Sequence, residues 1–349
     1  MKITLRSGAV VAAVGVGLSL AVLPVGPAGA ADGNGVACND IPALKAAINF
    51  ANTHPNTGIT LAPHCTYTLT APDNADDGLP EITGDVTITG RDTTIRRAPN
   101  VTQNFRVLHV LNGGNLTLNS LTISGGRSVS GSGGGIANNG TLNVNRTTIK
   151  SNQASSGGGL FSNGTLNLRR STVERNTADT FGGGIYNAGG TMTMNGGALL
   201  KNRASTDNGG GLENIGGTAS LNHVSVKGNT AIRGGGIRQT TGATLRLEES
   251  TVSDNIAVAG GGISNLGTAA TLVRSLVTHN TAITMGGGID NQIPSQVTLT
   301  ASRVIRNTPD NCTPAGSVPG CTNPAGTIAP PSSPVPPPAQ GTGGHKRVS

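Results

Sequence analysis

The chain has 349 residues, of which 12% are charged and 2% are aromatic, and its formal net charge is +7. The basic residues are scattered and are not clustered with aromatic residues that could stack on bases, so nucleic-acid binding is not expected. The four cysteines lack the C-x-x-C spacing of a zinc or redox motif, which argues against a metal centre.

Residues 1–30 have the features of a signal peptide. Lys2 and Arg6 form a charged start, residues 9–23 are largely apolar, and A-G-A at 28–30 fits a cleavage site. No second apolar run of about 18 residues follows, which argues against a membrane span. We therefore predict a secreted, extracellular protein, and a retained N-terminal anchor is the alternative.

The segment 31–80, with Cys38 and Cys65, is expected to form an N-terminal cap. Within it, residues 41–52 have Leu44, Ile48 and two alanines, Ala47 and Ala51, on one face, as in a short amphipathic helix. A helix at this place would cover the open first coil of the repeats that follow and protect its strand edge.

Residues 81–312 are organised by a repeat, in which residues 81–126 form looser coils. A triple glycine followed by isoleucine or leucine then occurs seven times, at spacings of 24, 25, 27, 25, 26 and 26 residues. A regular period in this range indicates a solenoid. These segments are 133–136, 157–160, 182–185, 209–212, 234–237, 260–263 and 286–289.

Each repeat also contains short segments in which polar and apolar residues alternate, such as T-L-N-L at 165–168. This period of two is typical of strands with one buried face. Three strands fit into each coil, with the patterns G-G-G-I-x-N, x-L-x-L and S/T-V-x-x-N. The sequence therefore predicts an all-β protein, a parallel β-helix of roughly ten coils stacked about 4.8 Å apart.

An asparagine recurs in every coil, three residues after an aliphatic residue. Seven buried polar side chains would be costly without partners, but stacked amides can donate to and accept from one another along the column. We predict a structural asparagine ladder. Its members are Asn152, Asn176, Asn202, Asn229, Asn255, Asn280 and Asn307.

The segment 313–349 begins with a short stretch that contains Cys321 and continues as a Pro-rich tail, which is expected to be disordered. Export permits disulfides. Pairing of Cys38 with Cys65 and of Cys312 with Cys321 is the local choice among three possible connectivities. Each bridge would then fasten one end of the solenoid.

With both columns in view, the chain resembles the pectin-lyase-like superfamily, and more narrowly the bacterial exported β-helix repeat proteins with G-G-G-I-x-N coils. It is also similar to the repeats of polymorphic outer membrane proteins, through residues 182–185. The resemblance covers roughly residues 41–312 and implies a right-handed β-helix. It does not select one function, because the superfamily includes lyases, hydrolases, adhesins and inactive binders, and the catalytic blocks of polygalacturonases and pectate lyases are absent.

The outward positions of the first strand are the candidate site. Two adjacent coils carry Phe161 and Tyr186 there, the next two carry Glu213 and Arg238, and the loops that enter this strand add further aromatic and charged residues. The candidate ligand-binding residues are Phe161, Asp179, Phe181, Tyr186, Asp207, Glu213, Arg233 and Arg238.

An aromatic platform beside carboxylates and guanidinium groups suits a sugar chain. We predict a non-catalytic protein that binds an extracellular polysaccharide or another cell-surface component. The alternative is a divergent polysaccharide lyase or glycoside hydrolase that acts on an acidic polysaccharide through the acidic residues and Arg238 of this set. A third interpretation is an ordinary solvated face. No cofactor or catalytic residue is predicted, although the same acids have the ligand chemistry for Ca²⁺.

Overall fold

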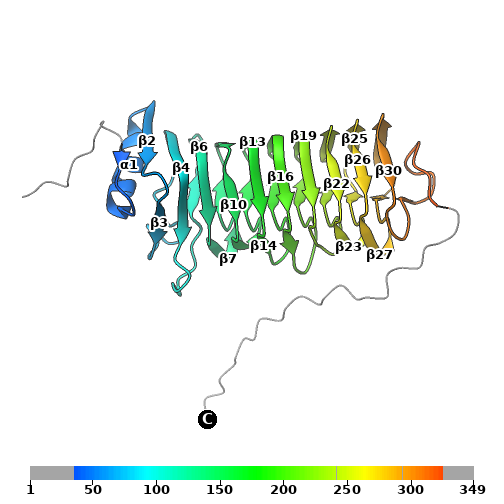
Figure 1. The fold of residues 1–349 in the computed structure, drawn as a ribbon, viewed down its shortest axis with the longest axis horizontal. Helices are drawn as coiled ribbons and strands as arrows, with labels where there is room; N and C mark the ends of the chain where they lie inside the picture. Colours follow the sequence, from blue (N-terminus) through cyan, green and yellow to red (C-terminus); the bar gives the residue numbers. More distant parts are fainter. Residues whose placement is uncertain (1–34, 241, 293, 325–349) are drawn as a thin grey trace, which may run out of the picture.

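The computed structural model describes residues 35–240, 242–292 and 294–324. This part of the chain is an elongated parallel β-solenoid of about 11 turns, with one short helix at its N-terminal end (Figure 1). The predicted all-β, right-handed parallel β-helix is confirmed. The predicted signal peptide at 1–30 and the Pro-rich tail from residue 325 lie outside the described residues.

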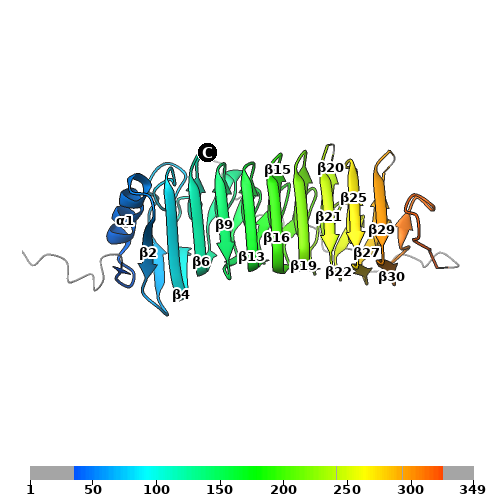
Figure 2. The ribbon, with the colours of Figure 1, turned by 90° about the horizontal axis from the view of Figure 1, so that it is seen from above.

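The helix α1 (Ile41–Thr53) covers the first coil at one end of the stack (Figure 2). It begins at Asp40, whose side chain accepts a hydrogen bond from the backbone N–H of Ala43 at 2.9 Å. Its apolar face buries Leu44 and Ile48 completely. A disulfide joins Cys38 to Cys65 beside this cap, as predicted. An N-cap, a buried stripe and a covalent link thus hold the helix over the strand edge.

The largest sheet, here called the long sheet, has 16 strands. Its strands are β1 (Gly35–Val36), β2 (Thr57–Leu61), β3 (Thr66–Leu69), β4 (Asp85–Arg97), β6 (Asn115–Ser124), β9 (Thr141–Asn145), β10 (Thr148–Lys150), β13 (Thr165–Glu174), β16 (Thr191–Leu200), β19 (Thr218–Lys227), β21 (Thr244–Glu248), β22 (Thr251–Ser253), β25 (Ala269–Val273), β26 (Leu276–Thr278), β29 (Gln296–Thr300) and β30 (Arg303–Ile305). In several coils the strands predicted for the patterns x-L-x-L and S/T-V-x-x-N are joined into one longer strand, as in β13.

The second sheet, here called the glycine sheet, has nine strands that mostly follow the triple glycines. They are β5 (Leu108–Val110), β8 (Ile136–Asn138), β12 (Leu160–Ser162), β15 (Ile185–Ala188), β18 (Leu212–Ile215), β20 (Ile237–Thr240), β24 (Ile263–Asn265), β28 (Ile289–Asn291) and β31 (Cys312–Thr313).

Most coils also contain a short strand before the glycines, which the sequence did not predict. These strands form two small sheets, here called the arm, along one edge of the solenoid (Figure 1). They are β7 (Arg127–Ser132), β11 (Gln153–Ser156), β14 (Thr177–Ala178), β17 (Arg203–Ala204), β23 (Ile256–Ala259) and β27 (Thr281–Met285). After each arm strand the chain turns back into the glycine sheet.

Each of the three glycines that follow an arm strand is required for a different steric reason. Gly182 has a φ of 63°, a left-handed conformation that favours glycine. A Cβ on Gly183 would lie 2.3 Å from the backbone of Arg203, and one on Gly184 would lie 2.6 Å from the carbonyl oxygen of Gly211. The triplet therefore allows the reversal and two close backbone approaches.

The interior consists of stacked columns of aliphatic side chains in register. Leu166, for example, pairs with Leu142 of the coil before and Met192 of the coil after, and all three are buried. Because each coil adds one layer to every column, the core is continuous from α1 to the last coil.

The asparagine ladder is confirmed. Along the seven predicted asparagines, each Nδ2 donates to the Oδ1 of the next at 2.9–3.1 Å. Each of those Oδ1 atoms also accepts the backbone N–H of the preceding asparagine. The side chains are thus buried with their polar atoms paired, as a structural ladder requires.

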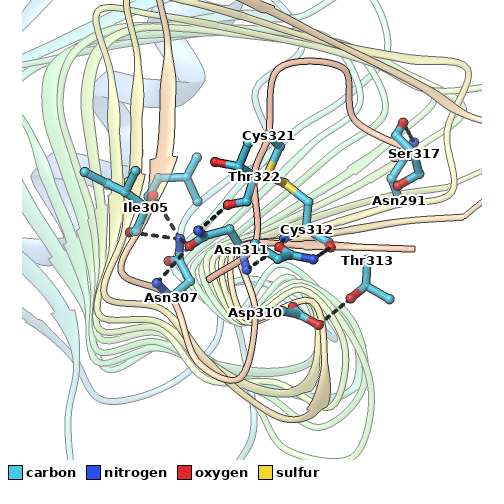
Figure 3. Close-up of a disulfide and its surroundings, with 12 residues drawn as sticks. Asn291, Ile305, Asn307, Asp310, Asn311, Cys312, Thr313, Ser317, Cys321 and Thr322 are labelled. Carbon is cyan, nitrogen blue, oxygen red and sulfur yellow. Dashed lines mark hydrogen bonds between the residues drawn. A yellow bond between two sulfur atoms is a disulfide. The ribbon is translucent and has the colours of Figure 1, made fainter. Parts of the chain in front are cut away.

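The ladder ends in a cap formed by the segment that the second predicted disulfide, Cys312–Cys321, closes (Figure 3). Asn307 donates to the Oδ1 of Asn311 at 3.2 Å, and Asn311 donates to the carbonyl of Thr322 at 2.8 Å. The last amide of the column therefore forms a hydrogen bond with the backbone of this C-terminal segment, so the ladder does not end in an unpaired group.

Candidate functional site

The predicted outward column of the glycine sheet has the expected order. Phe161 on β12 pairs in register with Tyr186 on β15, which pairs with Glu213 on β18, which pairs with Arg238 on β20. Neighbouring members are one strand spacing apart, because parallel strands in register place equivalent side chains next to each other.

Three aromatic side chains of the candidate set lie together. The ring of Tyr186 is 5.6 Å from that of Phe161 and 5.8 Å from that of Phe181, measured between centroids, and both pairs are tilted. Phe181 comes from the turn between β14 and Gly182, so the arm brings it to the column. All three are half-buried. They form a compact cluster of tilted rings, and each of the three side chains is partly exposed.

Glu213 is at its expected register position but fully buried, so it does not extend an exposed surface. Neither of its carboxyl oxygens has a hydrogen-bond partner among the described residues. Burial raises the pKa of Glu213 to about 8, with nearby Arg238 acting against the shift and Asp207 adding to it. At neutral pH its carboxyl is therefore mostly protonated.

The reason for this burial lies in the turn that enters the strand. Gly209 has a φ of 69°, and a Cβ on it would lie only 2.6 Å from the Cβ of Glu213. The backbone thus folds directly over the outward side chain. Three other outward positions of this sheet are also buried, at Ala137, Ser264 and Asp290.

The remaining charged members of the set lie along the arm. Asp179 and Asp207 are half-buried, and their backbone carbonyls accept hydrogen bonds from Thr206 at 2.8 Å and Ile232 at 2.7 Å. Arg233 is exposed. Among the described residues, the acids considered as Ca²⁺ ligands do not form a group of three ligating side chains, and the group of that kind that is present lies elsewhere.

That group is Asp77, Glu81 and His109, which the sequence analysis missed. His109 lies on β5 in register with Ala137, so it begins the same outward column. The Nη1 of Arg106 lies 2.7 Å from the Oδ1 of Asp77, and the Nδ1 of His109 lies 3.4 Å from its Oδ2. Because the guanidinium already neutralises Asp77, an ion network explains this cluster without a metal.

The two titratable partners in this network shift in opposite directions. Burial alone would lower the pKa of His109, but its hydrogen bonds with Asp77 and Asn139 raise the pKa above 6.5. Burial would likewise raise the pKa of Asp77, but hydrogen bonding with His109 and the charge of Arg106 lower it. No sequence motif joins these residues, since they come together only when the first coils stack.

No protein-family model, curated protein or solved structure matches this chain. The described part of the chain contains no helix with the length and apolarity needed to cross a membrane.

Proposed function

We propose that this protein binds a glycan chain without cleaving it, on the outward face of β12 and β15. The observation that supports the proposal is the contact of three half-buried aromatic rings, Phe161, Tyr186 and Phe181, on two adjacent coils. Rings grouped in this way offer apolar faces to the C–H side of a sugar, and their partial burial limits the entropy lost on binding.

The charged groups beside the cluster complement the polar side of such a ligand. Asp179 and Asp207 can accept hydrogen bonds from hydroxyl groups, and the exposed Arg233 can donate to hydroxyl or carboxylate groups. Each ring would contribute on the order of 1 kcal/mol, so we expect weak binding that strengthens with chain length.

Binding is favoured over catalysis because the most suitable acid is inaccessible. Glu213, whose raised pKa is a property of general acids, is enclosed by the turn at Gly209 and is fully buried. The raised pKa keeps a polysaccharide lyase or glycoside hydrolase as the second candidate. Release of unsaturated products or new reducing ends from a polysaccharide panel would establish that activity instead.

The proposed setting is extracellular. Two disulfides support an oxidising compartment, and the signal-like residues 1–30 would direct export. The coil pattern supports membership of the pectin-lyase-like superfamily, among the exported β-helix repeat proteins.

The test compares the mature protein with a Phe161→Ala, Tyr186→Ala double variant on a glycan array and by calorimetry. A matched control is Phe50→Ala, which removes an exposed aromatic ring on α1 at the end of the solenoid. We expect the double variant to lose about tenfold or more in affinity while the control binds as wild type. Unchanged binding by the double variant, or no binding of any glycan by wild type, would refute the proposal.

A further inference from the structure

A second surface with ligand-binding chemistry lies on the long sheet, away from the aromatic cluster. At the corner where the chain bends in the long sheet, several successive coils have a residue with a left-handed backbone, and the arginine and histidine side chains at these corners are exposed. On successive coils these corner residues are Arg146, Arg170, Gly196 and His223, with φ values of 47°, 50°, 70° and 55°. This column of corner residues thus has arginines on two adjacent coils, followed by a glycine, which has no side chain, on the third.

The missing side chain leaves a hollow at the corner. The nearest heavy atom to a Cβ built on Gly196 would be the Cγ of Arg170, at 3.6 Å. A recess of about 620 Å³ lies here, and its lining includes Arg146, Arg169, Arg170, Asn195, Asn222 and His223. A neighbouring recess of about 450 Å³ shares Arg169 and Asn195 and adds amides of Asn143, Asn145 and Asn167.

The three arginines of the recess are exposed and lack acidic partners. Among the described residues, Arg146, Arg169 and Arg170 form no ion pair. Arginines on later coils of the same sheet differ in this respect, because Arg246 and Arg274 are both paired with Glu248. His223, which lines the recess, pairs with Glu249 at the corner of the next coil. Like charges on adjacent rungs repel, so this positive cluster is most favourable when an anion occupies it.

We infer that this recess binds the anionic groups of an acidic polysaccharide. Guanidinium groups bind carboxylates and sulfates with paired hydrogen bonds, and arginines on adjacent coils are about 4.8 Å apart along the stack. The asparagine amides beside them can both donate to and accept from sugar hydroxyl groups. Single-stranded nucleic acid is less suited, because the lining has no phenylalanine, tyrosine or tryptophan ring on which successive bases would stack.

The site is independent of the proposed aromatic site, because it lies on a different sheet. The test measures binding of polygalacturonate, heparin, neutral dextran and single-stranded DNA by calorimetry at low and at physiological salt. We expect the wild-type protein to bind at least one of the two acidic polysaccharides, with an affinity that falls as the salt concentration rises. We expect no binding of dextran.

Two variants locate the binding. Arg169→Gln, Arg170→Gln should weaken it about tenfold or more, whereas Arg303→Gln, Arg306→Gln, which removes the same charge from exposed positions of a distant coil, should leave it within about twofold. Gly196→Asn, which fills the hollow but keeps every charge and suits a left-handed corner, should also weaken it.

Each contrary result would overturn the inference. Equal losses in the two arginine pairs would mean diffuse charge attraction, tighter binding of DNA would assign the recess to nucleic acid, and no polyanion binding would leave it without this role. The Phe161→Ala, Tyr186→Ala variant should retain polyanion binding through the recess. Failure of the aromatic site is therefore distinguishable from failure of this one.

Discussion

The carboxyl group of Glu213 shows how one buried side chain makes stability depend on pH. Its pKa rises from 4.5 to about 8 on folding. Between these values the unfolded chain releases the proton and the folded protein retains it, so the free energy of unfolding decreases as pH rises. The loss begins above pH 4.5 and is complete above about pH 8, at no more than about 5 kcal/mol.

We predict that Glu213→Gln is more stable than wild type at pH 8 to 9 and equally stable near pH 4, because a neutral amide removes the ionisation cost. Urea unfolding across this pH range measures the difference. Glu174→Gln is the matched control, since that carboxylate is half-buried and paired with Arg175. A Glu213→Gln variant less stable than wild type at pH 9 would show that the charged carboxylate is stabilised in the fold.

At the residue level the sequence identified side chains better than their environments. The order Phe161, Tyr186, Glu213, Arg238 followed directly from the repeat, because register is set by the buried isoleucines and leucines on either side. The burial of Glu213 did not, since it depends on the left-handed turn at Gly209. The pattern of glycines indicates that such a turn is permitted but not which side chain it covers.

The asparagine ladder links neighbouring coils into one hydrogen-bonded element. Asn229 donates to Asn255 and to the carbonyl of Leu199, each at 2.9 Å, and its Oδ1 accepts from the side chain and backbone of Asn202. A substitution here leaves buried donors and acceptors of the adjacent coils without partners.

We predict that Asn229→Leu lowers the free energy of unfolding by about 1 to 3 kcal/mol, although leucine is similar in size and more apolar. Thermal and urea unfolding test this. Asn163→Leu, at an exposed turn, should change stability by less than about 0.5 kcal/mol. Equal midpoints for wild type and Asn229→Leu would mean that the ladder adds nothing to stability.

At the element level, strands with a regular partner in every coil were predictable and the others were not. Two strands of the arm, β14 and β17, were missed because they have only two residues each, too few for alternation to be recognised. A column of buried hydroxyl groups, including Thr147, Ser171 and Ser250, was missed because Gly197 and Val224 interrupt it in the intervening coils.

The two ends of the described solenoid are closed by different means. At the N-terminal end α1 covers the strands, whereas at the C-terminal end a short disulfide-closed segment receives the last amides of the ladder. Stability in a stack of this kind is approximately a sum of coil and interface terms, so an end can open while the middle stays folded.

We predict that Cys312→Ser, Cys321→Ser speeds amide hydrogen exchange in β28 and β31 and leaves β13 and β16 unchanged, because the loss is local to the last coils. Mass spectrometry of exchanged peptides measures this. The matched variant Cys38→Ser, Cys65→Ser should affect only β1 to β4. Uniformly faster exchange through all coils would show that the stack unfolds as one cooperative unit.

The left-handed corners described above have a further consequence for how this protein can evolve. Their outward side chains do not fill the interior, and the backbone there already accommodates serine, arginine, glycine, histidine and glutamate on successive coils. A mutation at one corner therefore changes the exposed side chain of a single coil and has little effect on the free energy of unfolding. Duplication of a whole coil would move two such layers apart by one strand spacing of about 4.8 Å. The chemistry of this surface and its length can thus change while the fold stays the same.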